Sequence, residues 1–255
     1  MSKLSVVIIT FNEEKKIGRC IDSVRSIANE IIVVDSFSTD NTEKICKERK
    51  VKFIKHRFEG YIEQKNFALS FAKYPYVLCI DADEVLSERL AISIAEATEN
   101  FNADGYTMNR LTNYCGKWIK HCGWYPDRKL RIVNRNSAVW TGVNPHDKLV
   151  LYGKNNIKHL KGDLLHYSYD SISDHIKQMD MFSQIAANEL FKQGKSAGFF
   201  KVIFKAKAIF IKSYFIKLGF LDGFYGLVVC FLSAVSTFLK YSKLKELNDN
   251  KTLMK

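Results

Sequence analysis

Three apolar runs rich in β-branched residues, each closed by polar side chains, constrain the fold of this chain more than any other feature. They occupy residues 4–10, 30–34 and 76–80, and a further short strand is expected at residues 51–54. None alternates with polar residues, which is typical of strands that are covered on both faces. Helical periodicity fills the stretches between the runs, so the order along the chain is βαβαβαβα. This order predicts a parallel sheet with right-handed crossovers and helices on both faces.

The pattern changes after residue 102. Short, aromatic-rich strands are expected from residue 105 to about residue 150, and the chain after His166 is expected to be mostly helical. No internal repeat and no low-complexity linker interrupts the sequence. We therefore predict an α/β domain with a C-terminal helical tail. The predicted bounds are residues 1–168 for the domain, with halves 1–102 and 103–168, and residues 169–255 for the tail.

The composition allows a packed core and indicates an anionic partner. Of the 255 residues, 47% are hydrophobic, and the formal net charge is +12. Nucleic acid, a phosphorylated small molecule and an anionic membrane surface all fit this charge. The six cysteines include no C-x-x-C pair, which favours reduced thiols in the cytoplasm.

No targeting or membrane-spanning segment is expected. The N-terminus leads directly into a strand and has no secretory pattern. No apolar run reaches the ~20 residues that span a bilayer. The longest candidate, residues 224–239, is interrupted by Gly226, Ser233, Ser236 and Thr237.

The polar groups that close the strands predict a ligand site. In open α/β sheets, ligands bind outside the carboxyl ends of the strands. The sequence has no G-x-G-x-x-G, and Gly194-Lys195-Ser196 lacks the first glycine of a P-loop because Glu189 stands there. A bound phosphate would then need another source of positive charge, such as Mg²⁺ or Mn²⁺ held by one or two carboxylates.

Asp81 and Asp83 are the candidate carboxylates for this cation. They are two residues apart, so they point the same way while the chain stays extended. The alternative is that Asp83 or Glu84 only begins the next helix.

Four segments at these strand ends resemble family 2 glycosyltransferases of the GT-A fold. They are SVVIITFNEE at 5–14, IIVVDSFSTD at 31–40, QKNFAL at 64–69 and LCIDADE at 78–84. The likeness is closest to the bacterial subgroup that contains lipopolysaccharide-core β-glucosyltransferases. Weaker signals continue at residues 124–127, at Arg131, at residues 144–147 and at residues 221–223. The resemblance implies a Rossmann-like, mostly parallel central sheet, with the nucleotide bound by residues 1–102 and the acceptor by residues 103–168.

The resemblance also implies a role for individual residues. For the nucleotide, these are Thr10, Asn12 and Glu13 lining the pocket, Asp35 receiving the base, Lys65 beside the nucleotide and Asp81 on the ribose side. For the metal, they are Asp83 and, as a further ligand or a contact to the diphosphate, His166. For the acceptor, they are Trp124, Tyr125 and Arg131. The alternatives are a core histidine at His166 and packing under the second half of the sheet for Trp124 and Tyr125.

Asp147 is the candidate general base. The subgroup carries a His-Glu pair after its aromatic strands, and this chain has His146-Asp147, with a carboxylate one methylene shorter. A sugar hydroxyl is a poor nucleophile, so a carboxylate must accept its proton during attack on the anomeric carbon. One displacement from the opposite face would invert that centre. The alternative for Asp147 is a surface turn after Pro145.

The tail is basic and rich in aromatic residues. Asp222 is the only acid between residues 192 and 245, where ten lysines alternate with bulky apolar side chains. Helices of this kind suit the surface of an anionic membrane. The alternative is a pair of core-packed helices with a solvated lysine face. Nucleic acid is disfavoured because no nucleic-acid-binding motif accompanies the lysines.

Together these features predict an inverting, non-processive glycosyltransferase at the inner face of the cytoplasmic membrane. No Gln-x-x-Arg-Trp element of processive sugar polymerases is present. The predicted donor is a nucleotide sugar, first of all UDP-glucose or another UDP-hexose. The predicted acceptor is a hydroxyl of a lipopolysaccharide core or another surface glycan, presented on a glycolipid or oligosaccharide. The alternatives are a polyprenyl-phosphate acceptor and a non-catalytic sugar-nucleotide-binding membrane protein.

Overall fold

The computed structural model describes residues 2–144, 146–153 and 156–253, and the chain forms two compact units. The first comprises Met1–Leu111 and Asp127–Tyr167, and the second comprises Thr112–Pro126 and Ser168–Lys255. One division falls between Tyr167 and Ser168, and the predicted roles of the domain and the tail stay a prediction. The short segment Thr112–Pro126 belongs to the helical unit and not to the expected second half of the α/β domain.

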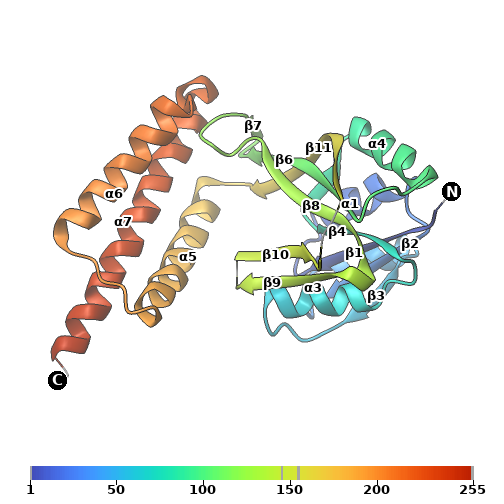
Figure 1. The fold of residues 1–255 in the computed structure, drawn as a ribbon, viewed down its shortest axis with the longest axis horizontal. Coiled ribbons are helices and arrows are strands. Elements are labelled where there is room, and N and C mark those ends of the chain that lie inside the picture. Colours follow the sequence, from blue (N-terminus) through green and yellow to red (C-terminus); the bar gives the residue numbers. More distant parts are fainter. Residues whose placement is uncertain (1, 145, 154–155, 254–255) are drawn as a thin grey trace. The chain divides into compact units, whose positions relative to one another are not determined.

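A mixed sheet forms the centre of the first unit (Figure 1). Its strand order is β3-β2-β1-β4-β8-β6-β11-β5. The bounds are β1 Leu4–Thr10, β2 Glu30–Asp35, β3 Lys52–Lys55, β4 Tyr76–Asp81, β5 Glu84–Leu86, β6 Gly105–Tyr114, β8 Asp127–Asn134 and β11 Ile157–Tyr169. The first four strands pair in parallel, as their apolar runs predict. The α/β prediction is confirmed. The strands after residue 102 make the sheet mixed, because β8 pairs antiparallel with β4 and β6 pairs antiparallel with β8.

Helices cover both faces of the parallel strands, which explains why β1, β2 and β4 are largely apolar, whereas the edge strand β3 has an exposed lysine at each end. The helices are α1 Ile17–Val24, α2 Thr42–Glu48, α3 Tyr61–Ser70 and α4 Glu88–Glu99. Alternate residues of β1 point to opposite faces. Val6 and Ile8 pack with α1 and α4, whereas Val7 packs with α3. The stripe Ile17, Cys20, Ile21 and Val24 of α1 is buried, at the spacing of one helix face.

A two-stranded hairpin lies on the α3 side of the sheet. It consists of β9 Ala138–Val143 and β10 His146–Leu151, after a short 3-10 turn at Arg135–Ser137. Trp140 and Leu149 of the hairpin share a core cluster with Ala68 and Leu69 of α3. The hairpin therefore brings residues from late in the domain to the helix after β3.

The second unit consists of helices and one short strand. Its elements are β7 Lys117–Ile119, α5 Ile172–Lys192, α6 Phe199–Ile211, a π turn at Lys212–Ile216, a 3-10 turn at Gly219–Asp222 and α7 Gly223–Leu253. Helix α7 packs against both α5 and α6 (Figure 1). One core of this unit gathers Tyr114, Ile119, Cys122, Val229 and Cys230, so the segment before β8 is buried against the start of α7.

The expectation that no segment is long and apolar enough to cross a membrane is wrong. The stretch Gly219–Asn250 contains an 18-residue window with a mean hydropathy of 1.6 and passes that test by length and composition, a test that core helices of soluble proteins also pass. Polar residues do not interrupt α7, because the hydroxyl groups of Ser233 and Thr237 donate hydrogen bonds to backbone carbonyls of the same helix. Ser233 Oγ donates to the Val229 carbonyl at 2.7 Å, and Thr237 Oγ1 donates to the Ser233 carbonyl at 3.0 Å.

Gly226 is needed where the 3-10 turn meets α7. A Cβ atom at Gly226 would lie 2.0 Å from the carbonyl oxygen of Gly219, which is backbone and has no side chain to rotate away. We expect Gly226→Ala to lower the free energy of unfolding by about 1–3 kcal/mol, as overpacking of a tight core does. Chemical unfolding followed by circular dichroism measures this change.

Gly198→Ala is the matched control for this prediction. Gly198 has no heavy atom within 4 Å of its Cβ position. This variant should unfold like the parent chain. Equal stability of the two alanine variants would contradict the close approach at Gly226.

Candidate active site

The parallel strands bring three polar side chains to one edge of the sheet. Thr10 ends β1 opposite Asp35 of β2, and Asp81 ends β4 opposite Ile9. Because parallel strands run in the same direction, their carboxyl ends lie side by side. The residues that the sequence analysis selects at these strand ends therefore share one edge.

The loops after β1 and β2 hold each other at this edge. The Asn12 amide N–H donates to Ser38 Oγ at 2.8 Å, and the Thr39 N–H donates to Asn12 Oδ1 at 2.8 Å. The Glu13 N–H donates to Thr42 Oγ1 at 2.9 Å. Asn12 takes the left-handed conformation with φ 53°, which asparagine tolerates better than most residues. The loop that carries Asn12 and Glu13 is thus fixed by the second loop.

Asp35 is fully buried and organises its own loop. Its carboxylate accepts hydrogen bonds from the N–H and the hydroxyl of Ser38. Thr10 Oγ1 is also buried and has no hydrogen-bond partner among the described residues. Asp35 therefore orders the loop after β2, and its contact with a nucleotide base stays a prediction.

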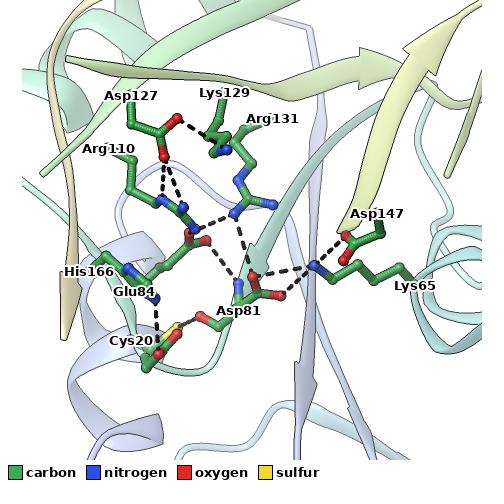
Figure 2. Close-up of polar contacts among 11 residues, drawn as sticks. Cys20, Lys65, Asp81, Glu84, Arg110, Asp127, Lys129, Arg131, Asp147 and His166 are labelled. Carbon is green, nitrogen blue, oxygen red and sulfur yellow. Dashed lines mark hydrogen bonds and ion pairs between the residues drawn. The ribbon is translucent and has the colours of Figure 1, made fainter. Parts of the chain in front are cut away.

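Lys65 lies between the carboxylates of Asp81 and Asp147 (Figure 2). Its Nζ is 3.1 Å from Asp81 Oδ1 and 2.9 Å from Asp147 Oδ2, and its side chain is 9% exposed. The ammonium also lies 4.5 Å from the centre of the Trp140 ring. Burial by itself lowers the pKa of Lys65, but Asp81 and Asp147 bring this pKa above its ordinary value. Lys65 is therefore a charged link between the sheet edge and the hairpin.

Helix α3 also clamps the hairpin that carries Asp147. Asn66 Nδ2 donates to the Trp140 carbonyl, and the Trp140 N–H donates to Asn66 Oδ1, each at 2.9 Å. The Ile62 N–H donates to Asn144 Oδ1 at 3.0 Å. Asp147 itself lies opposite Gly142 in the hairpin, and Pro145 lies outside the described residues. These bonds place Asp147 at the site although it is distant in sequence.

A buried pair of charges supports the turn after β4 (Figure 2). Glu84 is fully buried, and its Oε2 accepts the Asp81 N–H at 3.0 Å. Its other oxygen lies 2.6 Å from Arg131 Nη2, which is also 3.4 Å from Asp81 Oδ2. Beyond them, Arg110 donates two hydrogen bonds to Asp127. This role of Glu84 was not predicted from the sequence, although its place in the run Asp81-Ala82-Asp83-Glu84 offered a signal.

The expectation that Arg131 contacts the acceptor does not fit its position. Arg131 is only 4% exposed, and its guanidinium group is occupied by Glu84 and Asp81. A cation in this interior needs carboxylate partners, because an unpaired buried charge is costly. Arg131 therefore supports the turn after β4 from the protein interior.

Trp124 and Tyr125, the other expected acceptor residues, belong to the helical unit. Trp124 is half-buried, and its ring packs edge-on against Tyr114 and His175. This contact fits the packing alternative for Trp124. Tyr125 is also half-buried, and its contact with an acceptor stays a prediction.

Asp83 and His166 lie together at the end of β4. His166 stands on β11 opposite Glu84 of β5, and its Nε2 is 3.2 Å from Asp83 Oδ2. Burial by itself raises the pKa of Asp83, but His166 brings this pKa below its ordinary value. Asp83 is therefore held as a carboxylate.

This pair fits a partial site for a divalent cation. Among the residues that the structure describes, no three His, Cys, Asp or Glu side chains gather as ligands. Mg²⁺ is commonly held by one or two carboxylates, with substrate phosphates and water as the remaining ligands. Asp83 and His166 offer one oxygen and one nitrogen donor of suitable kind. His166 Nδ1 is buried and has no hydrogen-bond partner in the described ranges, so the ring still lacks the partner that usually fixes a metal-binding histidine.

The charge of Asp81 should make the free energy of unfolding depend on pH. Burial by itself raises the pKa of Asp81, but Lys65 and Arg131 hold this pKa well below its ordinary value. A carboxyl group with a lowered pKa in the folded state stabilises the fold above its unfolded pKa of about 4, and this contribution is lost as the pH falls below that value.

We therefore expect Asp81→Asn to lower the free energy of unfolding by about 3 kcal/mol at neutral pH, since it leaves two buried cations short of a partner. The difference from the parent chain should shrink in acid, as urea unfolding at a series of pH values would measure. Asp22→Asn is the control, because Asp22 pairs with Arg49 in a largely exposed salt bridge. Such a pair contributes about 1 kcal/mol or less. A loss for Asp81→Asn that does not change with pH would contradict the ionic role of this carboxylate.

The chain is similar to known proteins of one family. Residues 5–151 match the family model described as glycosyl transferase family 2. An uncharacterized glycosyltransferase of Rickettsia typhi is 35% identical over 97% of this chain and 88% of its own. A lipopolysaccharide core biosynthesis glycosyltransferase of Rhizobium meliloti is 29% identical over 94% of this chain and 93% of its own.

Two solved structures are also similar. The TarS 1–349 structure of S. aureus has 16% identity and a TM-score of 0.47, over 98% of this chain and 92% of that one. Glucosyl-3-phosphoglycerate synthase of Mycobacterium tuberculosis, solved with Mn²⁺ and UDP, has 22% identity and a TM-score of 0.37, over 44% of each chain. The mixed sheet with helices on both faces is the GT-A fold that the sequence predicts. The family match and the 35% identity to the Rickettsia typhi protein show that the chain belongs to glycosyl transferase family 2 and is a glycosyltransferase.

Proposed function

We propose that this glycosyltransferase transfers a hexose, in the first place glucose, from a UDP-linked donor to an acceptor hydroxyl with inversion. The acceptor is a lipopolysaccharide core or another surface glycan. The observation that carries the proposal is the position of Lys65, whose Nζ joins Asp147 at 2.9 Å to Asp81 at 3.1 Å. A candidate base thus lies at the sheet edge where the donor is expected. The similarity to the Rhizobium meliloti lipopolysaccharide core enzyme supports the class of acceptor.

In this proposal Asp147 accepts the proton of the acceptor hydroxyl. General base catalysis of this kind contributes roughly 10²–10⁴-fold to a rate. Lys65 orients the Asp147 carboxylate through a short, largely buried ion pair. The oxygen freed of its proton attacks the anomeric carbon from the face opposite the leaving diphosphate. A single displacement inverts that carbon, so an α-linked donor gives a β-linkage.

The donor occupies the loops after β1, β2 and β4. Thr10, Asn12 and Glu13 line the nucleotide pocket, Asp35 supports the loop under the base, and Asp81 faces the ribose side. Asp83 and His166 would hold Mg²⁺ or Mn²⁺, which when bound supplies positive charge to the leaving diphosphate. Lys65, already paired with two carboxylates, sets the distance between donor and base and does not need to contact the nucleotide.

In the same proposal, the helical unit binds a membrane surface, and the reaction takes place there. An acceptor carried on a lipid is presented at the inner face of the cytoplasmic membrane. The net charge of +12 and the lysine-rich helices support association with anionic lipid. A peripheral enzyme in this position meets a soluble donor and a lipid-borne acceptor together.

The base assignment is tested by Asp147→Asn. We expect kcat to fall roughly 10²–10⁴-fold, while KM for the donor changes only a few-fold, because Asp147 acts on the acceptor hydroxyl. Transfer from a panel of UDP-, GDP- and other nucleotide sugars to lipopolysaccharide-core acceptors would measure both constants. Asp22→Asn, at a salt-bridged carboxylate of the same unit, is the control and should keep full activity. Near-normal turnover by Asp147→Asn would contradict a hydroxyl acceptor and favour a polyprenyl phosphate, which needs no strong base.

The metal assignment is tested by Asp83→Asn. Loss of one ligand should weaken Mn²⁺ binding in the presence of UDP at least about tenfold. Mutation of a residue that only hydrogen-bonds to a metal ligand already weakens metal binding about 10–100-fold. Electron paramagnetic resonance of Mn²⁺ measures this binding without any turnover. Glu96→Gln, at an exposed carboxylate of α4, should bind Mn²⁺ like the parent chain. Unchanged Mn²⁺ affinity in Asp83→Asn would remove Asp83 from the metal site.

A further inference from the structure

The turn between α6 and α7 exposes a dense group of large apolar side chains. We call residues 212–224 the turn segment. Ile216 is 69% exposed and Phe224 67% exposed. The other exposed apolar residues of the turn segment are Phe215, Leu218, Phe220 and Leu221. Contiguous exposed apolar surface of this kind marks an interaction site for protein or membrane.

The turn segment buries three residues, Ser213, Gly219 and Asp222, instead of these apolar ones. Ser213 Oγ donates to the Ile209 carbonyl at 2.8 Å, which places this hydroxyl against its own helix. Gly219 packs so closely that a Cβ atom there would lie 2.6 Å from Cys230 Sγ. The interior of the turn is therefore closed, and the apolar side chains have no place in it.

Asp222 is the only carboxylate in the stretch from residue 192 to residue 245, and the structure turns it inward. It is 4% exposed and accepts hydrogen bonds from the Lys120 N–H at 3.3 Å and the His121 N–H at 2.8 Å. The His121 ring also contacts this carboxylate, with Nδ1 at 2.9 Å from Asp222 Oδ1. A buried carboxylate needs such partners because desolvation of the charge is costly. The consequence is that this stretch presents no carboxylate to solvent.

Four exposed lysines lie in the turn segment or in the neighbouring segment Thr112–Pro126. Lys212 and Lys217 belong to the turn segment, and Lys117 and Lys120 come from Thr112–Pro126, which contains no acid. The two segments are close: Lys117 Nζ lies 3.5 Å from the Cβ position of Gly223, and Lys217 Cγ lies 3.6 Å from that of Gly123. The surface thus combines bulky apolar groups with positive charge and, within these two segments, lacks exposed negative charge.

This combination distinguishes between the partners that an apolar surface can have. A second copy of the chain would bring two sets of lysines together, and like charges across an interface are unfavourable. An anionic bilayer offers phosphate groups at its surface and hydrocarbon just beneath, which match lysines beside aromatic and aliphatic side chains. On the basis of the proposed membrane association, we infer that the turn segment inserts into anionic lipid while Lys117, Lys120, Lys212 and Lys217 contact the lipid phosphates.

Vesicle binding by the full chain tests this inference. The parent chain should bind vesicles that contain phosphatidylglycerol at least about tenfold more tightly than vesicles of phosphatidylcholine alone, and high salt should release it. The double variant Phe215→Ser with Ile216→Ser should bind at least about tenfold more weakly. Lys212→Gln with Lys217→Gln should lose roughly 30-fold at low salt, at about fivefold for each lysine near an anionic surface.

Matched controls come from the α/β unit. Ile92 and Ile157 are exposed apolar residues there, with Ile92 60% exposed, and Ile92→Ser with Ile157→Ser should bind vesicles like the parent chain. Lys44→Gln with Lys161→Gln, at two exposed lysines of that unit, controls for the loss of charge. Circular dichroism of each variant checks that its helices are intact.

Several outcomes would overturn the inference. They are equal binding by the turn-segment variants and their controls, binding that ignores phosphatidylglycerol, and retention of the parent chain on vesicles at high salt. A dimer in sedimentation equilibrium that the Phe215→Ser and Ile216→Ser changes dissociate, with lipid binding unchanged, would assign the surface to a second copy. Vesicle binding needs neither donor nor acceptor. Failure of sugar transfer with intact vesicle binding would therefore count against the proposed reaction alone.

Discussion

The ion pairs of Lys65 are the interaction on which the rest of the site depends. A largely buried ammonium group is stable only with carboxylates beside it, and Asp81 and Asp147 supply them from two different parts of the α/β unit. Asp81 closes a parallel strand of the sheet, and Asp147 belongs to a hairpin that packs on α3. One cation therefore fixes the distance between the edge of the sheet and the candidate base.

The turn after β4 is supported in the same way from the opposite side. The Glu84 carboxylate accepts a hydrogen bond from the Asp81 N–H and forms an ion pair with Arg131 in the protein interior. The removal of either partner would leave a buried charge without compensation. The pair therefore fixes the geometry of the turn that carries Asp81 and Asp83.

The α/β core could be predicted from sequence because its signals are local. The apolar runs of β1, β2 and β4 and the helical stripe of α1 follow from strand and helix periodicity alone. The edge that carries Asp35 and Asp81 follows from the direction of parallel strands. The burial of Arg131, the link through Lys65 and the assignment of Thr112–Pro126 to the helical unit depend on residues far apart in sequence. Likewise, the continuity of α7 depends on hydroxyl groups bonding back to its own carbonyls, which composition does not reveal.

The two hydrogen bonds between Asn66 and Trp140 have a mechanical consequence. Asn66 engages both backbone groups of one residue, as a neighbouring strand would, so the hairpin cannot slide along α3 without breaking both bonds at once. Helix and hairpin therefore move as one body, and Asp147 travels with Lys65 when either shifts. If Asp147 is the base, the acceptor must bind with its hydroxyl next to this carboxylate, because the carboxylate cannot move toward the hydroxyl independently of α3.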